Sequence, residues 1–293
     1  MLPAVLFPQK IWNRVWYAVG ALALPLNALR HGLQGYTRPR GIDPREIREA
    51  IEYDWEVVAR WRATLNERFP GFDIRSKHIL ELGPGPDLGV GLILLGLGAA
   101  SYAAIDRHPL AAATPQQFYD ELKSSIMARI PEADESRLTP NNVRYIVRND
   151  FSFTEVNGRS IDLIVSNAAF EHFDDPADVI KRLTPLASPG CVFVADIDLQ
   201  THSRILRDRD PLSIYRYGSR WYRLWKFIGS PNRVRPSQFS HALASNGWKT
   251  ISMDARIVLD PQTVEAVRPF LAAPYTDPTA QIEILDFMLT AQI

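Results

Sequence analysis

Residues 78 to 89 read HILELGPGPDLG, an apolar pentapeptide that leads into a glycine-rich turn. The pentapeptide predicts a short buried strand, and the turn predicts the start of a helix at about Leu88. Glycines in such a turn let a ligand approach the backbone closely, and amide groups near Gly85 and Asp87 can bind an anionic group such as a carboxylate. The spacing does not fit a dinucleotide motif, because its third glycine would stand where this chain has Leu88.

Strand-like and helix-like segments alternate around this turn. Asp43-Pro44-Arg45-Glu46 combines a helix cap, a proline for the first turn and an acid three residues after the cap, and predicts a helix up to about Pro70. Further helices are expected after Thr114 and Asp175. Further strands are expected at Ser101–Ile105, Val143–Val147, Ile161–Val165 and Cys191–Ala195. This alternation predicts an α/β domain with a doubly wound, mostly parallel sheet of the Rossmann-like type.

The C-terminal part of the chain predicts an antiparallel hairpin at the sheet edge. A helix from about Pro236 to near Gly247 precedes two strand-like segments, Trp248–Val258 and Glu283–Ala291. We therefore expect one domain over residues 43–293, with a core at residues 78–200, and a separate helical segment at residues 1–42.

Polar residues stand where the predicted strands end. Asp106 ends the second strand, 23 positions after Gly83, where an acid can accept both hydroxyls of a ribose. Asn149-Asp150-Phe151 follows the third strand. The fourth strand continues into Ser166-Asn167-Ala168-Ala169-Phe170-Glu171-His172-Phe173-Asp174-Asp175-Pro176. This combination is far more specific than a glycine turn alone.

Residues 78 to 200 resemble the class I S-adenosylmethionine-dependent methyltransferases, in the subgroup whose fourth strand leads into a Glu-His-hydrophobic-x-Asp-Pro turn. The resemblance implies a cofactor site in which Glu81, Gly83 and Gly85 surround the methionine part, Asp106 holds the ribose, Asp150 and Phe151 flank the adenine, and Asn167 with Ala168 lines the floor, together with Asp87 and Arg107. Pro86-Asp87 departs from the small residues that are usual after the second glycine. The alternatives are that the glycines only form a turn, that Asp106 is a cap or surface acid, and that Asp150 is a turn residue.

Methyl transfer to a hydroxyl requires two positioned reactants and a base. Glu171 and His172 follow the fourth strand, and Asp198 and His202 follow the fifth, so all four can border the same edge of the sheet. We expect His172 and His202 to be the catalytic residues, because the ordinary pKa of histidine suits proton transfer near neutral pH. A structural hydrogen bond is the alternative role for His172, and Glu171 fits a structural role better than a catalytic one.

Residues 203–235 form an unusual insert that contains eight arginines, one lysine and several aromatic residues. Arginine forks and aromatic faces suit sugars, phosphates or carboxylates, so we expect a helical lid over the acceptor. An amphipathic helix at residues 215–227 with a solvated basic face is the alternative. The segments 196–202 and 232–235 also resemble, more loosely, methyltransferases that accompany bacterial surface-polysaccharide synthesis. That resemblance favours O-methylation of a glycan or glycolipid precursor, with a small-molecule acceptor as the rival.

Two other functional classes stay open at this point. An NAD-dependent oxidoreductase would use the same sheet and Asp106, although the glycine spacing and the segment from Asn167 to Pro176 argue against it. The second class that stays open is a non-catalytic binding module that keeps the fold.

Residues 11–29 are mostly apolar but contain Asn13, Arg14, Pro25 and Asn27, which interrupt them too often for a membrane-spanning helix. Five basic residues precede the first acid, Asp43; they are Lys10, Arg14, Arg30, Arg38 and Arg40. The segment can pack on the enzyme's own body or a partner subunit, or residues 1–40 can rest peripherally on an anionic membrane surface. A signal sequence is a third alternative, but a clear cleavage site is missing.

Composition sets the remaining expectations. Basic and acidic residues balance at 33 each, which does not indicate a nucleic-acid partner. The single cysteine excludes an intrachain disulfide and suggests a cytoplasmic protein, with the inner face of the membrane as the alternative location. The six histidines show no ligand spacing, so we expect no bound metal. A monomer or homodimer is expected.

Overall fold

The computed structural model describes residues 9–34, 41–156, 160–227 and 229–293. Two of the basic residues counted above, Arg38 and Arg40, lie outside these ranges, as do residues 1–8 of the N-terminal segment. In the described ranges, a helix with the length and apolarity needed to cross a membrane is not present. The prediction that residues 11–29 are too interrupted to span a membrane is thus confirmed.

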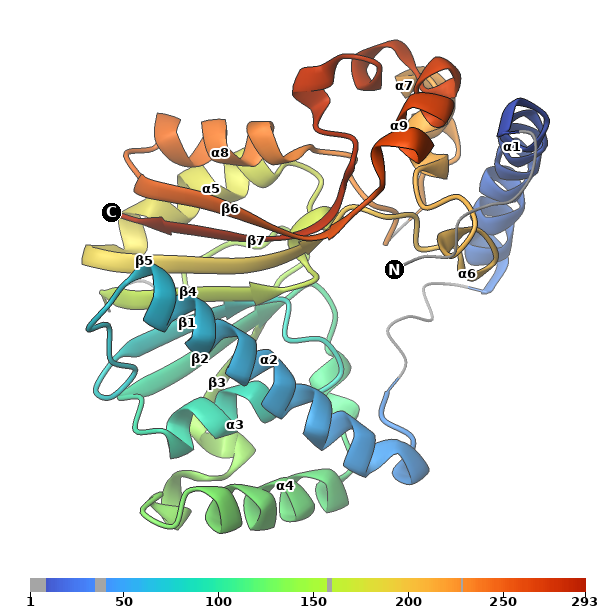
Figure 1. The fold of residues 1–293 in the computed structure, drawn as a ribbon. Coiled ribbons are helices and arrows are strands. Elements are labelled where there is room, and N and C mark those ends of the chain that lie inside the picture. The colour runs from blue at the N-terminus through green and yellow to red at the C-terminus, as the bar shows by residue number, and fades with distance from the viewer. Residues whose placement is uncertain (1–8, 35–40, 157–159, 228) are drawn as a thin grey trace.

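A seven-stranded sheet forms the centre of the described structure (Figure 1). Its strands are β1 (His78–Leu82), β2 (Ser101–Asp106), β3 (Val143–Val147), β4 (Ile161–Asn167), β5 (Ala187–Asp198), β6 (Lys249–Val258) and β7 (Ile284–Gln292). The order is β3-β2-β1-β4-β5-β7-β6, and β7 pairs antiparallel with both β5 and β6. The predicted Rossmann-like sheet with an antiparallel edge hairpin is confirmed.

Helices cover both faces of the sheet because side chains along each strand alternate between the faces. Ile79 joins one hydrophobic core and its neighbour Leu80 joins the other. One face packs against α2 (Ile47–Arg68), α3 (Gly89–Gly96) and α4 (Gln116–Arg129), and the other against α5 (Pro176–Leu183) and α8 (Pro236–Ser245) (Figure 1).

The predicted N-terminal boundary of α2 is close to the observed one. Asp43 caps a short 3-10 turn, Pro44–Glu46, by accepting a hydrogen bond from the Arg45 amide at 2.9 Å, and α2 follows directly. The buried stripe of α2 contains an acid, Asp54, among apolar residues. The stripe therefore carries a polar group toward the interior.

The insert at residues 203–235 is not one helix. A short α6 (Arg204–Arg207) leads to a 3-10 turn, Ser213–Arg216, and then to α7 (Ser219–Leu224). The alternative of an amphipathic helix over residues 215–227 is thus wrong, because an extended break at Tyr217 and Gly218 separates the two elements.

Three arginines of the insert are buried within the protein and do not form a solvated basic face. Arg216 donates to both carboxylate oxygens of Asp210 at 2.8 Å and to the Asn13 side chain at 2.8 Å. Arg235 donates to the carbonyl oxygens of Ala280 and Ile284. Buried arginine is stable only with such paired and hydrogen-bonded partners. These side chains fix the insert to neighbouring segments.

A third hydrophobic cluster joins the insert to α9 (Pro261–Val267) and α1 (Gln9–Gln34), at the right end of the molecule in Figure 1. It contains side chains of the insert and of α9, with Leu24 of the N-terminal helix α1 packed against it. One face of α1 thus packs on the protein's own body, which was one of the alternatives predicted for the N-terminal segment.

Candidate active site

A cavity of about 840 Å³ lies at the carboxyl ends of the parallel strands, within the range of about 300–1,000 Å³ usual for ligand sites. Its walls include Gly83, Gly85, Asp106, Arg107, Phe151, Asn167, Ala168, His172 and His202. The structure therefore brings together most of the predicted cofactor residues and both predicted catalytic histidines. Glu81, Asp87 and Asp150 are outside the described lining of this cavity.

The glycine turn after β1 requires two glycines for different reasons. Gly83 and Gly85 both have positive φ angles, +71° and +79°. A Cβ on Gly83 would lie 2.5 Å from the Cβ of Ala169, whereas a Cβ on Gly85 would have no described atom within 4 Å. Gly83 thus allows a close approach between two turns, and Gly85 leaves space beside the cavity.

Asp106 ties the glycine turn to the end of β2. Its Oδ2 accepts a hydrogen bond from the Gly85 amide at 3.2 Å, and its Oδ1 accepts one from the His108 amide at 3.0 Å. Burial raises the pKa of Asp106, and these backbone donors oppose the shift. Each oxygen has a second lone pair, so the carboxylate that lines the cavity can accept two further hydrogen bonds.

The two residues predicted to flank the adenine have different surroundings. Asp150 is exposed, and its Oδ1 accepts from the Ser152 amide at 3.0 Å, which matches the alternative of a turn residue. Phe151 is buried with a φ of +48°, and its ring centroid lies 4.6 Å from that of Phe173. Phe151 is therefore part of the cavity wall, and Asp150 is not among the lining residues.

Asn167 and Ala168 line the cavity where β4 ends. The Asn167 side chain accepts from Arg60 at 3.0 Å and donates to the Tyr53 hydroxyl at 2.8 Å, so two residues of α2 hold it. Ala168 has a φ of +49°, and its amide donates to the Asp196 carbonyl oxygen. A positive φ at alanine costs about 1–2 kcal/mol and marks a site where the surrounding structure fixes the backbone.

Buried acids lie behind the glycine turn. Tyr102 donates to the Glu81 carboxylate at 2.6 Å, and Asp87 accepts from the Gly89 amide at 2.8 Å. Burial raises the pKa of Glu81 to about 8 and that of Asp87 to about 6. Burial and the nearby Asp87 raise the pKa of Asp54 as well. These acids create a region of negative potential close to the turn when they ionise.

We expect the stability of the protein to depend on pH through Glu81. The carboxyl binds its proton more tightly in the folded state, where its pKa is about 8, than in the unfolded state, where the ordinary value is 4.5. The free energy of unfolding therefore falls as pH rises through this window, by about 1.4 kcal/mol per pH unit. Glu81→Gln stays neutral and should flatten the dependence of Tm on pH between pH 5 and 8. Parallel curves for the two proteins would contradict this assignment.

The two histidines predicted as catalytic lie next to each other. Their ring centroids are 4.7 Å apart, and Nε2 of His202 lies 3.5 Å from Oδ2 of Asp198. Burial lowers the pKa of His172 to about 3, so this ring is neutral and a weak base. Burial alone would raise the pKa of Asp198, but His202 and Arg207 outweigh it, and the net shift is downward. Asp198 is thus a carboxylate that can stabilise a protonated His202.

Glu171 completes a group of possible metal ligands with these histidines. One ligand atom from each of Glu171, His172 and His202 lies within 4.8 Å of the others. Both carboxylate oxygens of Glu171 are buried and have no hydrogen-bond partner among the described residues, and burial raises the pKa of this carboxyl well above its ordinary value. Two histidines and a carboxylate can bind a transition metal, so this is where the expected absence of a metal can be tested.

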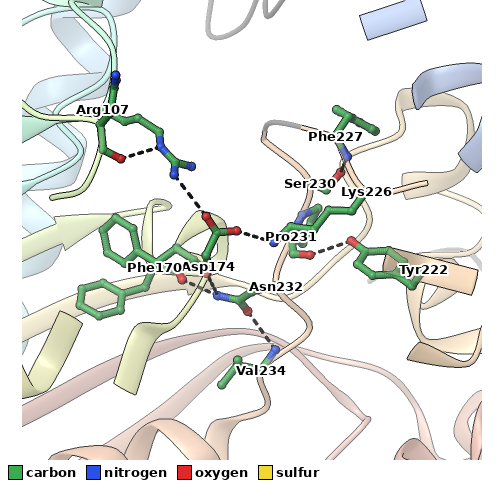
Figure 2. A network of polar contacts seen from close by, with 12 residues as sticks. Arg107, Phe170, Asp174, Tyr222, Lys226, Phe227, Ser230, Pro231, Asn232 and Val234 are labelled. Atoms are coloured by element: carbon green, nitrogen blue, oxygen red, sulfur yellow. Dashed lines mark hydrogen bonds and ion pairs between the residues drawn. The ribbon is translucent and has the colours of Figure 1, made fainter. Parts of the chain in front are cut away.

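The insert is fastened to the turn that follows β4 (Figure 2). The Asn232 side chain donates to the carbonyl oxygens of Phe170 at 2.8 Å and Phe173 at 3.0 Å and accepts from the Val234 amide. Lys226 and Arg107 both pair with Asp174, whose pKa is lowered chiefly by the Lys226 hydrogen bond (Figure 2). The insert therefore forms a fixed wall beside the histidines.

Asn232→Ala is expected to lower the free energy of unfolding by about 2–4 kcal/mol, because three hydrogen bonds are lost and buried carbonyl oxygens lose their donor. Urea denaturation measures this change. Asn142→Ala is the matched control, because its side chain makes a hydrogen bond to Ser136 on the exposed surface. Equal losses in the two variants would show that Asn232 does not fasten the insert.

Sequence reasoning missed the contribution of α1 and α2 to the site. Tyr53 of α2 and Arg30 of α1 line the cavity, and Arg60 holds Asn167. One signal was available, since Asp54 is an acid within the apolar stripe of α2. Conversely, the insert arginines that were expected to bind the acceptor are not among the cavity residues wherever their side chains are described.

Comparisons with known proteins identify the family of the chain. The family model described as methyltransferase domain matches residues 53–253. No curated protein sequence matches significantly. An S-adenosylmethionine-dependent methyltransferase from Mesorhizobium loti is 17% identical, with 80% of this chain and 98% of that chain covered and a TM-score of 0.45. The plantazolicin methyltransferase BpumL in complex with SAH is 13% identical, with 94% and 98% covered and a TM-score of 0.46.

A third similar structure is the Haemonchus contortus phosphoethanolamine N-methyltransferase 2 in complex with S-adenosyl-L-methionine, at 11% identity, 80% and 52% coverage and a TM-score of 0.45. The family model itself spans more than half of the present chain. The Rossmann-like sheet is also the one expected for a class I methyltransferase. The chain therefore belongs to the methyltransferase domain family.

Proposed function

We propose that the protein transfers a methyl group from S-adenosylmethionine to a hydroxyl group of an acceptor bound in the cavity. The observation that carries this proposal is the continuity of that cavity. The same cavity is lined by the glycine turn and Asp106 and by His172 and His202. A cofactor and an acceptor in this space would therefore lie in contact, as methyl transfer requires.

The residues fit the cofactor. The space beside Gly85 is open, and the Asp106 carboxylate lines the wall with hydrogen-bonding capacity left for a ribose. The buried acids Glu81, Asp87 and Asp54 favour a nearby cationic ligand when ionised. When bound, S-adenosylmethionine supplies an electrophilic methyl group on a sulfonium sulfur. The direct contacts of Glu81, Asp87 and Asp150 with it stay predictions.

His202 is the better of the two candidate bases. Asp198 lies beside its Nε2 and favours a proton there, which leaves Nδ1 as the nitrogen that accepts the acceptor's hydroxyl proton. The Asp198 carboxylate then stabilises the imidazolium, and Arg207 positions Asp198 through an ion pair at 2.6 Å. His172 is neutral and buried, so its role is to pack beside His202 and shape the wall.

The acceptor side of the cavity suits a molecule with several hydroxyl groups. It combines polar side chains, Asn27, Arg30 and Ser213, with the aromatic rings of Tyr222 and Phe227. Aromatic faces and hydrogen-bonding groups together are suited to sugar rings. These features support a glycan or glycolipid precursor as the acceptor class.

Calorimetric titration with S-adenosylhomocysteine, with NAD as the control ligand, tests the cofactor part of this proposal. Micromolar binding of S-adenosylhomocysteine and no binding of NAD is the expected result. Binding of NAD alone would favour the oxidoreductase alternative, against which the family match argues. Failure of both ligands would favour a non-catalytic binding module and overturn the proposal.

A further inference from the structure

One face of α1 is fixed to the protein. The Asn13 side chain donates to the Ala266 carbonyl oxygen at 3.0 Å and accepts from Arg216, and the backbone oxygen of Tyr17 accepts from the Tyr217 hydroxyl at 2.6 Å. Further along, the His31 ring stacks on Phe227 with centroids 4.2 Å apart. The orientation of the helix about its own axis is therefore defined.

The opposite face of α1 is an exposed apolar stripe. Six side chains of this stripe are between 39% and 88% exposed, namely Ile11, Val15, Leu22, Leu26, Leu29 and Leu33. At about 100° per residue they fall within about 60° of one another around the helix. Asn13 and His31 point about 170° away from the centre of the stripe by the same geometry. The stripe is thus the part of α1 farthest from the protein body.

Charge identifies the partner that this stripe fits. The sequence of α1 contains three basic residues and no acidic residue. Arg14 and Arg30 flank the stripe, one on each side of it by the helical geometry. Trp12, on the same side as Arg30, adds an amphipathic aromatic group of the kind enriched at membrane interfaces. An apolar stripe with basic flanks is the arrangement of a helix that lies in the plane of an anionic membrane surface.

The cavity lies directly beneath this helix. Leu24, Asn27 and Arg30 of α1 belong to its wall, while the stripe faces away from it. The thickness of one helix, about 10 Å, therefore separates the stripe from the acceptor site. An acceptor held at a membrane surface could reach the cavity beside α1.

We propose that α1 docks the protein on an anionic membrane through the stripe, and that the membrane presents the acceptor as an amphiphile. The docking stands on the geometry and charge of α1, whereas the second part rests on the proposed function. The apolar side chains enter the interfacial layer, and the exposed Arg14 beside the stripe meets acidic headgroups. An amphiphilic acceptor of this kind would carry its hydroxyl group close to the headgroup layer of the membrane.

Flotation of the full chain with vesicles tests the docking. The protein should bind vesicles of equal parts phosphatidylglycerol and phosphatidylcholine, and high salt should weaken binding. Leu22→Glu combined with Leu29→Glu should weaken partitioning at least about tenfold, because two apolar groups that would enter the lipid are lost and two negative charges face the acidic headgroups. The matched control is Ile257→Glu with Val258→Glu, which removes two exposed apolar side chains from β6.

Binding by the control variant at the level of the unaltered protein supports the proposal. Absence of vesicle binding, or an equal loss in both variants, overturns it. A concentration-dependent dimer that only the α1 variant loses would show that a second copy covers the stripe, and would also overturn it. Titration with S-adenosylhomocysteine checks that each variant is folded, and its failure in the unaltered protein would sink the proposed function without touching the vesicle result.

The acceptor part has its own readout. Membranes from the source organism are incubated with the protein and methyl-labelled S-adenosylmethionine and then extracted with organic solvent. Label in the lipid extract, reduced several-fold with the α1 variant and unchanged with the β6 control, is the expected result. Label confined to the aqueous phase would show that the acceptor is not membrane-held.

Discussion

His202→Ala is expected to lower kcat by about 10²- to 10⁴-fold, the usual contribution of a general base. The affinity for S-adenosylhomocysteine should stay within about twofold of that of the unaltered protein, because the segments proposed to bind the cofactor, the glycine turn and Asp106, do not include His202. Single-turnover methyl transfer and calorimetry measure the two quantities separately.

Added imidazole should restore part of the activity of His202→Ala, which a merely structural defect would not allow. His241→Ala is the matched control, since this exposed histidine lies on α8, outside the active-site cavity. Treatment with a chelator should leave the unaltered protein active. If the chelator abolished activity and added metal restored it, Glu171, His172 and His202 would be ligands and His202 could not be the base.

Gly83→Ala is expected to weaken the binding of S-adenosylhomocysteine at least about tenfold. The new methyl group would overlap Ala169, and its backbone would hold a φ of +71°. The two effects together amount to about 2–5 kcal/mol, and they are relieved only if the turn moves into the cavity where we propose that the cofactor binds. Calorimetry measures the affinity, and thermal unfolding measures the strain.

Gly71→Ala separates the two effects. Gly71 has a φ of +92°, but a Cβ there meets no atom of the described chain within 4 Å. This variant should lose about 1–2 kcal/mol of stability and keep its cofactor affinity. If Gly83→Ala also kept its affinity, the turn would not form part of the cofactor site.

The sheet could be predicted from the sequence because buried parallel strands read as continuous apolar runs between turns. The position of β7 between β5 and β6 could not be predicted from the sequence. The pattern predicts that the last two strands pair with each other, but it does not say which of the two contacts β5. The insert was misjudged for a related reason. Arg216 reads as a solvated residue until the fold places Asp210 and Asn13 around it.

The site was partly predictable because chemistry in α/β proteins gathers at the carboxyl ends of strands. This rule located Gly83, Asp106 and His202 on the cavity wall. It could not locate Tyr53 or Arg30, which belong to helices, because helical periodicity shows which face is apolar but not what the other residues meet. Asp150 fulfilled the positional rule but lies exposed in a turn.

The position of β7 has a consequence for how the chain folds. Val192 of β5 pairs with Gln292 of β7, a hundred positions away, whereas β6 and β7 pair across a much shorter connection. Loop closure favours the nearer contact first, so the β6–β7 hairpin should form before it captures β5. Until that moment the edge of β5 is an unpaired template for other chains. Refolding from denaturant should accordingly lose yield to aggregation as protein concentration rises, and dilution should recover it.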